Sequence, residues 1–151
     1  MTDRPISSWV SCRVGKTMLG VELSRVQEIN RMVEATFVPR LPAEVRGLIN
    51  LRGNLVTVLD LSRILENRPS VAARDSRNVI VERHGERFGF LVDSVGDVVT
   101  SDQPLEALPS HMDPQQARWW KGLVQLADHV MLALDVDAVL GAATEVAGNR
   151  G

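Results

Sequence analysis

The chain has 151 residues, 44% hydrophobic and 24% charged, which suits one packed domain or two small units sharing a core. Its 17 basic and 19 acidic residues give a net charge of −2 and form no basic stripe, which argues against a nucleic-acid partner. The single cysteine, Cys12, excludes an internal disulfide and suits a reducing compartment.

No segment is typical of export or of membrane insertion. Four charged residues interrupt the first twenty positions, so these positions lack the apolar centre of a signal peptide. The longest strongly apolar run, residues 130–134, is far too short to span a bilayer. We therefore expect a cytoplasmic protein that does not insert directly into a membrane.

Short strands dominate the hydrophobic pattern. The first is the alternating stretch of residues 9–14, in which Cys12 is expected to be a packing residue. Further strands are expected at residues 55–59, 79–81 and 88–92. Hairpin reversals are expected at the Gly-, Asn- or Asp-containing segments 52–54, 84–86 and 127–129.

Helical signals are brief. Asp60 or Ser62 could cap one turn over residues 63–65, which would end near residues 67–69. Residues 115–121 could form another turn or two. Many short strands at regular spacing favour a barrel or a sandwich over a doubly wound sheet.

The sequence also contains an internal repeat. Residues 47–51 (Gly-Leu-Ile-Asn-Leu) match residues 122–126 (Gly-Leu-Val-Gln-Leu) at an offset of 122 − 47 = 75, and the match continues without a gap to Leu140. Residues 20–29 match residues 89–98 at an offset of 89 − 20 = 69. Conservative hydrophobic matches also arise by chance among strands, so coincidence is the alternative interpretation.

A true repeat would make the chain two similar β units in tandem. Their boundary would lie near residues 67–78, and an insertion near residues 110–118 would account for the change in offset. About 70 residues is a natural size for a small five-stranded barrel, and two such units would need each other's surface for stability.

No catalytic or metal-binding constellation is indicated. The histidines lie in expected turns or loops, without metal-ligand spacing, at His84, His111 and His129. Carboxylates end expected strands at Asp60, Asp93 and Asp135. We interpret these carboxylates as caps or turn residues, with an acid–base pair as the alternative.

Two features have both a structural and a functional interpretation. Arg52 is either an exposed turn residue that clamps nearby carbonyls or a contact for a partner; its repeat equivalent, Ala127, lacks the charge, which favours the contact. Trp119 and Trp120 are adjacent, and adjacent strand residues face opposite sides, so one is expected in the core while the other could be exposed to a partner.

Several segments together resemble the CheW-like family of chemotaxis coupling proteins. In chain order they are residues 20–29, residues 38–53 with Gly-Leu-Ile-Asn-Leu-Arg-Gly at 47–53, residues 55–65, residues 89–98, and residues 108–109 with 122–140. The resemblance covers about residues 8–141. One departure is Thr57, where the family often has proline.

The resemblance implies a mostly β fold: two similar small SH3-like five-stranded β-barrel subdomains packed around a shared hydrophobic core, with short helical turns. A single CheW-like domain would span residues 8–141, between an N-terminal tail of residues 1–7 and a flexible C-terminal tail of residues 142–151. Subdomain one would cover about residues 15–70 and subdomain two about residues 78–141, with exchange of the terminal strands left open.

The function implied by the resemblance is that of a scaffold, not an enzyme, without a cofactor. Such adaptors couple chemoreceptors (methyl-accepting chemotaxis proteins) to a CheA-type histidine kinase in signal transduction. They bind the kinase regulatory domain with one surface and the receptor cytoplasmic tip with another, and partners recruit them to membrane receptor arrays. Alternatives are an adaptor controlling pilus motility or second-messenger output, a generic SH3-like peptide-binding module, and a small hydrolase. The aromatic content of 4% and the absence of Tyr weigh against the peptide-binding module.

Site residues follow from the same resemblance, position by position. Val26 and Glu28 match kinase-binding residues. Arg52, Val79 and Val98 match residues associated with receptor coupling or binding. The structural motif around the arginine consists of Gly47, Asn50 and Gly53.

Overall fold

The computed structural model describes residues 6–31 and 33–148, and most of the expected N-terminal tail, residues 1–7, lies outside them. Over the described residues, ten strands form two five-stranded sheets. Sheet A contains β1 (Ser7–Val14), β2 (Thr17–Glu22), β8 (Ser94–Ser101), β9 (Trp120–Gln125) and β10 (Val130–Leu134), in the order β8-β1-β2-β10-β9. Sheet B contains β3 (Val26–Arg31), β4 (Val45–Leu51), β5 (Asn54–Asp60), β6 (Arg77–Arg83) and β7 (Glu86–Val92), in the order β3-β6-β7-β5-β4.

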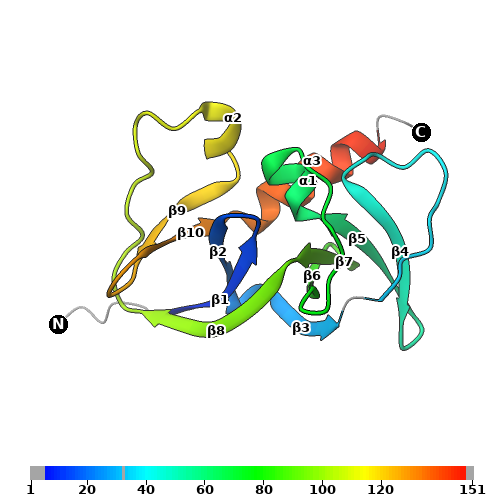
Figure 1. The fold of residues 1–151 in the computed structure, drawn as a ribbon, viewed down its shortest axis with the longest axis horizontal. Coiled ribbons are helices and arrows are strands. Elements are labelled where there is room, and N and C mark those ends of the chain that lie inside the picture. The colour runs from blue at the N-terminus through cyan, green and yellow to red at the C-terminus, as the bar shows by residue number, and fades with distance from the viewer. Residues whose placement is uncertain (1–5, 32, 149–151) are drawn as a thin grey trace.

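Helices are few and short. They are the 3₁₀ turn η1 (Leu23–Arg25), α1 (Leu61–Glu66), α2 (Pro114–Ala117) and α3 (Val136–Gly148). Figure 1 shows α1 and α3 on one side of the paired sheets, while β3 and β8 run along the other side. The mostly β fold expected from the sequence is confirmed, and closure of either sheet into a barrel stays a prediction.

The internal repeat is confirmed by the pairing register of the two sheets. In the parallel strand pair of sheet A, Leu19 lies opposite Leu132. In the parallel pair of sheet B, Phe88 lies opposite Thr57. These positions differ by 88 − 19 = 69 and 132 − 57 = 75, the two offsets of the sequence repeat. The two sheets are therefore copies of one strand arrangement.

In each sheet, a loop packs against a glycine of the equivalent edge strand, β4 in sheet B and β9 in sheet A. The glycines have positive φ, 146° at Gly47 and 157° at Gly122. A Cβ at Gly47 would lie 2.3 Å from the carbonyl oxygen of Thr36, and one at Gly122 would lie 2.7 Å from that of Glu106. Glycine is required at both positions because the loop backbone occupies the space of a side chain.

Sheet membership cuts across the division expected at residues 15–70 and 78–141. The β1–β2 hairpin of the first repeat joins β8, β9 and β10 of the second, whereas the β6–β7 hairpin of the second joins β3, β4 and β5 of the first. Each sheet thus consists of a hairpin from one repeat and three strands from the other. This exchange ties the two repeats into one folding unit.

The shared hydrophobic core expected from the sequence lies between the sheets. One cluster contains buried side chains from both, including Val10, Cys12, Phe90 and Leu140. Each sheet also has a small cluster of its own, with Ile80 in sheet B. Burial raises the pKa of the Cys12 thiol to about 12, so this cysteine is a packing residue, as expected.

The expected flexible tail from residue 142 is corrected by α3, which continues to Gly148. The carboxylate of Asp135 accepts a hydrogen bond from the Ala138 N–H at 3.0 Å, and so caps the helix. Four alanines and the absence of proline then allow the helix to extend. Residues 149–151 lie outside the described part of the chain.

Candidate functional site

The strand-end carboxylates have structural partners. Asp60 is buried, caps α1 through the Arg63 N–H at 3.2 Å, and accepts a second N–H from Ser70 at 2.8 Å. Asp93 accepts the Gly15 N–H at 2.7 Å, which fixes the β1–β2 turn. The interpretation of these residues as caps and turn anchors is confirmed. Within residues 6–31 and 33–148, no group of three acidic, His or Cys side chains is placed to hold a metal ion.

The β4–β5 hairpin presents Arg52 in an unusual backbone conformation. Arg52 and Gly53 have φ values of 52° and 85°, and Leu51 pairs with Asn54 on either side of them. Positive φ at both central residues is the geometry of a type I′ hairpin turn, which favours Asn or Gly. The Asn50 side chain stabilises the turn by accepting the Gly53 N–H at 2.8 Å. Turn formation therefore does not account for an arginine at this tip.

The Arg52 guanidinium pairs with Glu28 instead of clamping carbonyls. Its Nη2 donates to Glu28 Oε2, with 74% of the Arg52 side chain exposed and 28% of that of Glu28. An exposed pair of this kind contributes at most about 1 kcal/mol to stability. The structure thus pairs Arg52 with Glu28, although the family resemblance assigned Arg52 to the receptor and Glu28 to the kinase.

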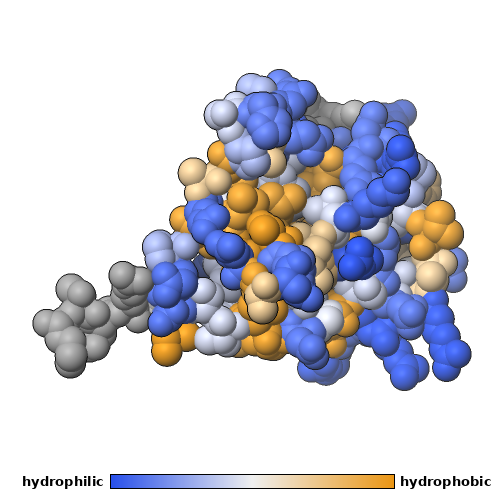
Figure 2. All heavy atoms as spheres, turned by 60° about the vertical axis from the view of Figure 1, so that its left-hand side comes forward, coloured by the Kyte–Doolittle hydropathy of each residue, from blue (hydrophilic) through white to orange (hydrophobic). Residues whose placement is uncertain are grey.

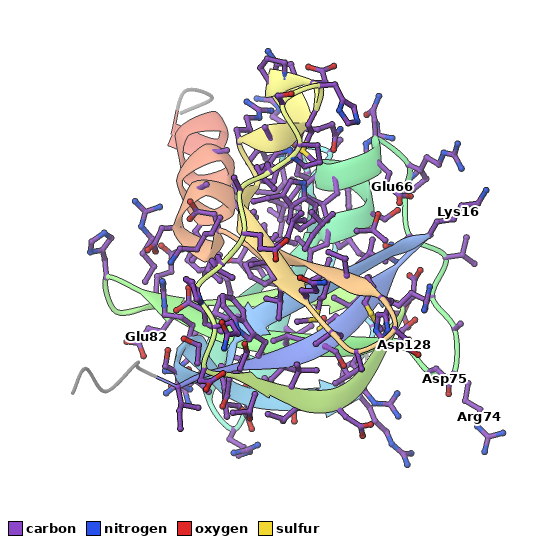
Figure 3. All side chains as sticks on the ribbon, turned by 90° about the vertical axis from the view of Figure 1, so that its left-hand side faces the viewer. Lys16, Glu66, Arg74, Asp75, Glu82 and Asp128 are labelled. Carbon is purple, nitrogen blue, oxygen red and sulfur yellow. The ribbon has the colours of Figure 1, made fainter. Side chains whose placement is uncertain are left out.

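Strand β3 is the exposed edge of sheet B around Glu28. Val26 is half-buried and packs against the shared core. Gln27 donates a hydrogen bond to Glu82 of β6, which projects from the surface in Figure 3. Ile29 is 39% exposed. This strand thus presents mixed polar and apolar side chains along an open edge.

The two valines assigned to receptor binding lie in different environments. Val98, on edge strand β8, is 52% exposed and accessible. Val79 is fully buried in the shared core. We correct the assignment of Val79, because a side chain without exposed area has no surface with which to contact a receptor.

Two apolar residues of sheet B that were not selected from the sequence are exposed. Leu55 is 69% exposed and follows the Arg52 turn, and Ile29 is the repeat equivalent of Val98 (98 − 69 = 29). Applying the repeat offset to Val98 would have identified Ile29. Nothing in the pattern marked Leu55 as exposed, because it begins an apolar run.

Both members of the Trp119–Trp120 pair are buried, with 4% and 7% of their area exposed. The Arg118 guanidinium lies 4.1 Å from the centre of the Trp119 ring and covers it. The alternative of an exposed partner contact is therefore wrong, and these residues belong to the core.

Sheet A has a concave face of its own. Figure 2 brings this side forward and shows hydrophobic side chains gathered in the middle, with hydrophilic ones around them. A concavity of about 980 Å³ includes Trp9, Leu105 and Val124 in its lining. On its rim, Lys121 Nζ lies 2.8 Å from Glu22 Oε1, and this hydrogen bond raises the pKa of Lys121. Sheet A therefore has a concave surface whose lining mixes apolar side chains with polar and charged ones.

The described part of the chain includes no helix long and apolar enough to cross a bilayer.

The comparisons with known proteins agree with the resemblance. The family model "CheW-like domain" matches residues 8–144. A probable chemotaxis protein CheW of Rhizobium etli is 28% identical over 133 residues, covering 86% of this chain and 84% of that protein. The chemotaxis protein CheW of Klebsiella aerogenes is 27% identical over a region that covers 84% of this chain and 77% of that protein. The crystal structure of scaffolding protein TtCheW from Thermoanaerobacter tengcongensis matches with a TM-score of 0.77 and 26% identity, over 87% of this chain and 86% of that one.

Proposed function

The chain belongs to the CheW-like domain family, and we propose that it is a non-catalytic chemotaxis scaffold that couples chemoreceptors to a CheA-type histidine kinase. Relatives named chemotaxis proteins, and a structural neighbour named a scaffolding protein, support this role. The adaptor works without a cofactor, in the cytoplasm, and its partners recruit it to membrane receptor arrays.

The observation that carries the proposal is Arg52 at the tip of the β4–β5 hairpin. A non-glycine residue with positive φ costs stability, and the Glu28 pair returns little because it is exposed. Because neither the backbone nor the ion pair favours an arginine here, its role is better explained by recognition, in which the planar guanidinium offers several donors to a partner. Leu55 beside it supplies an exposed apolar anchor.

We propose that Arg52 and the exposed Val98, but not the buried Val79, contact the receptor tip. We assign the kinase regulatory domain to Val26 and Glu28 on the β3 edge of sheet B. An edge strand presents unpaired backbone groups as well as side chains, which suits docking of another β-rich domain.

The test is a titration of the purified chain with the regulatory domain of the kinase and, separately, with a cytoplasmic fragment of the receptor. The Arg52→Glu variant should have the melting temperature of the wild type and should still bind the kinase domain. It should no longer bind the receptor fragment. Arg40→Glu is the matched control, because Arg40 is also an exposed arginine of positive φ, at 68°.

Glu28→Lys should weaken binding of the kinase domain. Receptor binding that persists in Arg52→Glu, or that is lost equally in Arg40→Glu, would contradict the assignment of Arg52. A wild-type chain that binds neither partner would contradict the proposed function itself.

A further inference from the structure

A second cavity lies between sheet B and the loop that precedes β4. Its volume is about 230 Å³, and residues of this loop, β4, β5, β7 and α3 surround it. Most of the lining is apolar: Val38, Leu41, Val45, Leu48, Leu59, Phe88 and Ala143. The remaining side chains are Thr57 and Glu86. The cavity shares none of its lining with the surfaces assigned above to receptor and kinase.

The repeat shows which residues of sheet A stand at the positions equivalent to the lining of the cavity. The pairing register makes Trp120 of sheet A the equivalent of Val45, because Trp120 lies opposite Leu134 and Val45 lies opposite Leu59. By the same offset of 75, Leu132 is the equivalent of Thr57. The chain thus has an indole ring and a leucine in sheet A where sheet B has a valine and a threonine.

The connecting loops add to this difference. In sheet A, Leu108 and Met112 of the longer loop pack against the shared core cluster, which also contains Trp120. In sheet B, the shorter loop supplies Val38 and Leu41, which line the cavity. Val45 and Thr57 are thus smaller than their counterparts in sheet A, whereas Phe88 is larger than its counterpart Leu19, and the space of the cavity lies on the side of the two smaller residues.

The size and the lining select the ligand. An engineered apolar cavity of about 150 Å³ already binds benzene, and this one is larger. The Thr57 hydroxyl and the Glu86 carboxylate can each accept a hydrogen bond. Among the side chains that the structure describes, no basic one lines the cavity to pair with an anion. Removing a charged ring from water would cost much more free energy among these apolar walls than removing a neutral one.

We propose that this cavity binds a small neutral aromatic molecule, of one or two fused rings, that carries an N–H or O–H donor. The loop and α3 border the cavity together with three strands. Indole, the ring that Trp120 supplies in sheet A, is the natural probe.

The experiment is a titration of the full chain with indole, followed by the backbone amide signals in two-dimensional NMR spectra. We expect saturable shifts at Val38, Val45 and Phe88. Val45→Trp, which places the residue of sheet A in sheet B, should abolish these shifts. Thr57→Leu narrows the cavity more gently and should weaken binding if Val45→Trp does not fold.

Val71→Ala is the control, since Val71 is an exposed apolar residue outside the cavity and outside the surfaces assigned to partners. This variant should bind indole as the wild type does. Shifts that do not saturate, or that persist in Val45→Trp, would overturn the proposal.

Sedimentation velocity distinguishes a second source of the same chemistry. Phe37 is 76% exposed and precedes the lining residue Val38. A wild-type dimer that Phe37→Ala dissociates, and that indole displaces, would identify the occupant as the ring of a second copy and overturn the small-molecule assignment. A monomer that still binds indole supports it.

Discussion

Sheets A and B share one strand order and one pairing register, yet their equivalent positions differ in chemistry. The shared features concern the backbone: a glycine under a loop, an aspartate before a helix, and parallel strands in the centre. The differences are side chains that this backbone does not require. Arg52 stands where the other copy has Ala127, and Val45 where it has Trp120.

The positions that are alike in the two sheets are those that the common backbone requires. A residue type that recurs at both offsets serves the common backbone, because each sheet needs it. A residue found in one copy only is not required by that backbone; it either packs in the core, as Trp120 does, or is available for a function of that copy alone. Arg52 and the cavity beside Val45 fall in the second group, and both lie in sheet B.

The largest expected effect comes from a position common to both copies. Gly47→Ala would place its Cβ 2.3 Å from the Thr36 carbonyl oxygen at a φ of 146°, so the loop and the strand would have to separate. We expect a loss of about 3 kcal/mol in the free energy of unfolding by urea denaturation. Gly122→Ala, at 2.7 Å, should lose less.

Gly53→Ala is the control for this experiment. Its φ is 85°, but a Cβ there would meet no atom within 4 Å, so only the backbone strain of about 1 kcal/mol applies. Equal losses at residues 47 and 53 would show that close approach of the loop is not what requires glycine.

The sequence was sufficient to predict the repeat, three of the four hairpins of the described residues and the aspartate caps, because each depends on local spacing. The exchange of hairpins between the repeats was left open for a physical reason. Two similar units offer similar edges, so local patterns do not decide whether β1–β2 pairs with its own unit or with the other.

The errors at single residues have equally specific causes. Val79, Ile80 and Val81 are all buried, because β6 is covered by the shared core on one face and by the cluster of sheet B on the other. A continuous apolar run of this kind does not reveal which side chain could reach a partner. The Arg52–Glu28 pair joins a hairpin tip to a separate strand, and sequence spacing does not encode that contact.

An intermediate effect of opposite sign is expected at a pair of facing asparagines, of which Asn78 is buried and Asn30 half-buried. Asn78 lies opposite Asn30, whereas the equivalent pair in sheet A is Trp9 and Val99. The Asn78 amide is fully buried, and neither its nitrogen nor its oxygen has a hydrogen-bond partner. Asn78→Leu should therefore stabilise the chain by about 1 kcal/mol in urea denaturation. Destabilisation would mean that the polar pair contributes an interaction that sheet A lacks.

The smallest expected effect on stability concerns an ion pair that links α3 to η1 and has no counterpart in the other repeat. Arg25 donates two hydrogen bonds to Asp137, at 2.9 and 3.0 Å, and the equivalent positions in the other copy are Ser94 and Ser62. The hydrogen bond from Arg25 lowers the pKa of Asp137 below its usual 3.8. A lowered pKa in the folded state stabilises the chain above the usual value, and this contribution disappears as the pH falls through the folded value.

Arg25→Ala should therefore cost about 0.5 kcal/mol at neutral pH, because Asp137 is largely exposed and solvent screens the pair. The difference from the wild type should vanish once acid protonates Asp137, which denaturation curves at neutral pH and below pH 3.8 would measure. Ser94→Ala, at the position equivalent to Arg25, should show no such pH dependence. A difference that persists unchanged in acid would mean that Arg25 holds α3 through packing of its side chain rather than through charge.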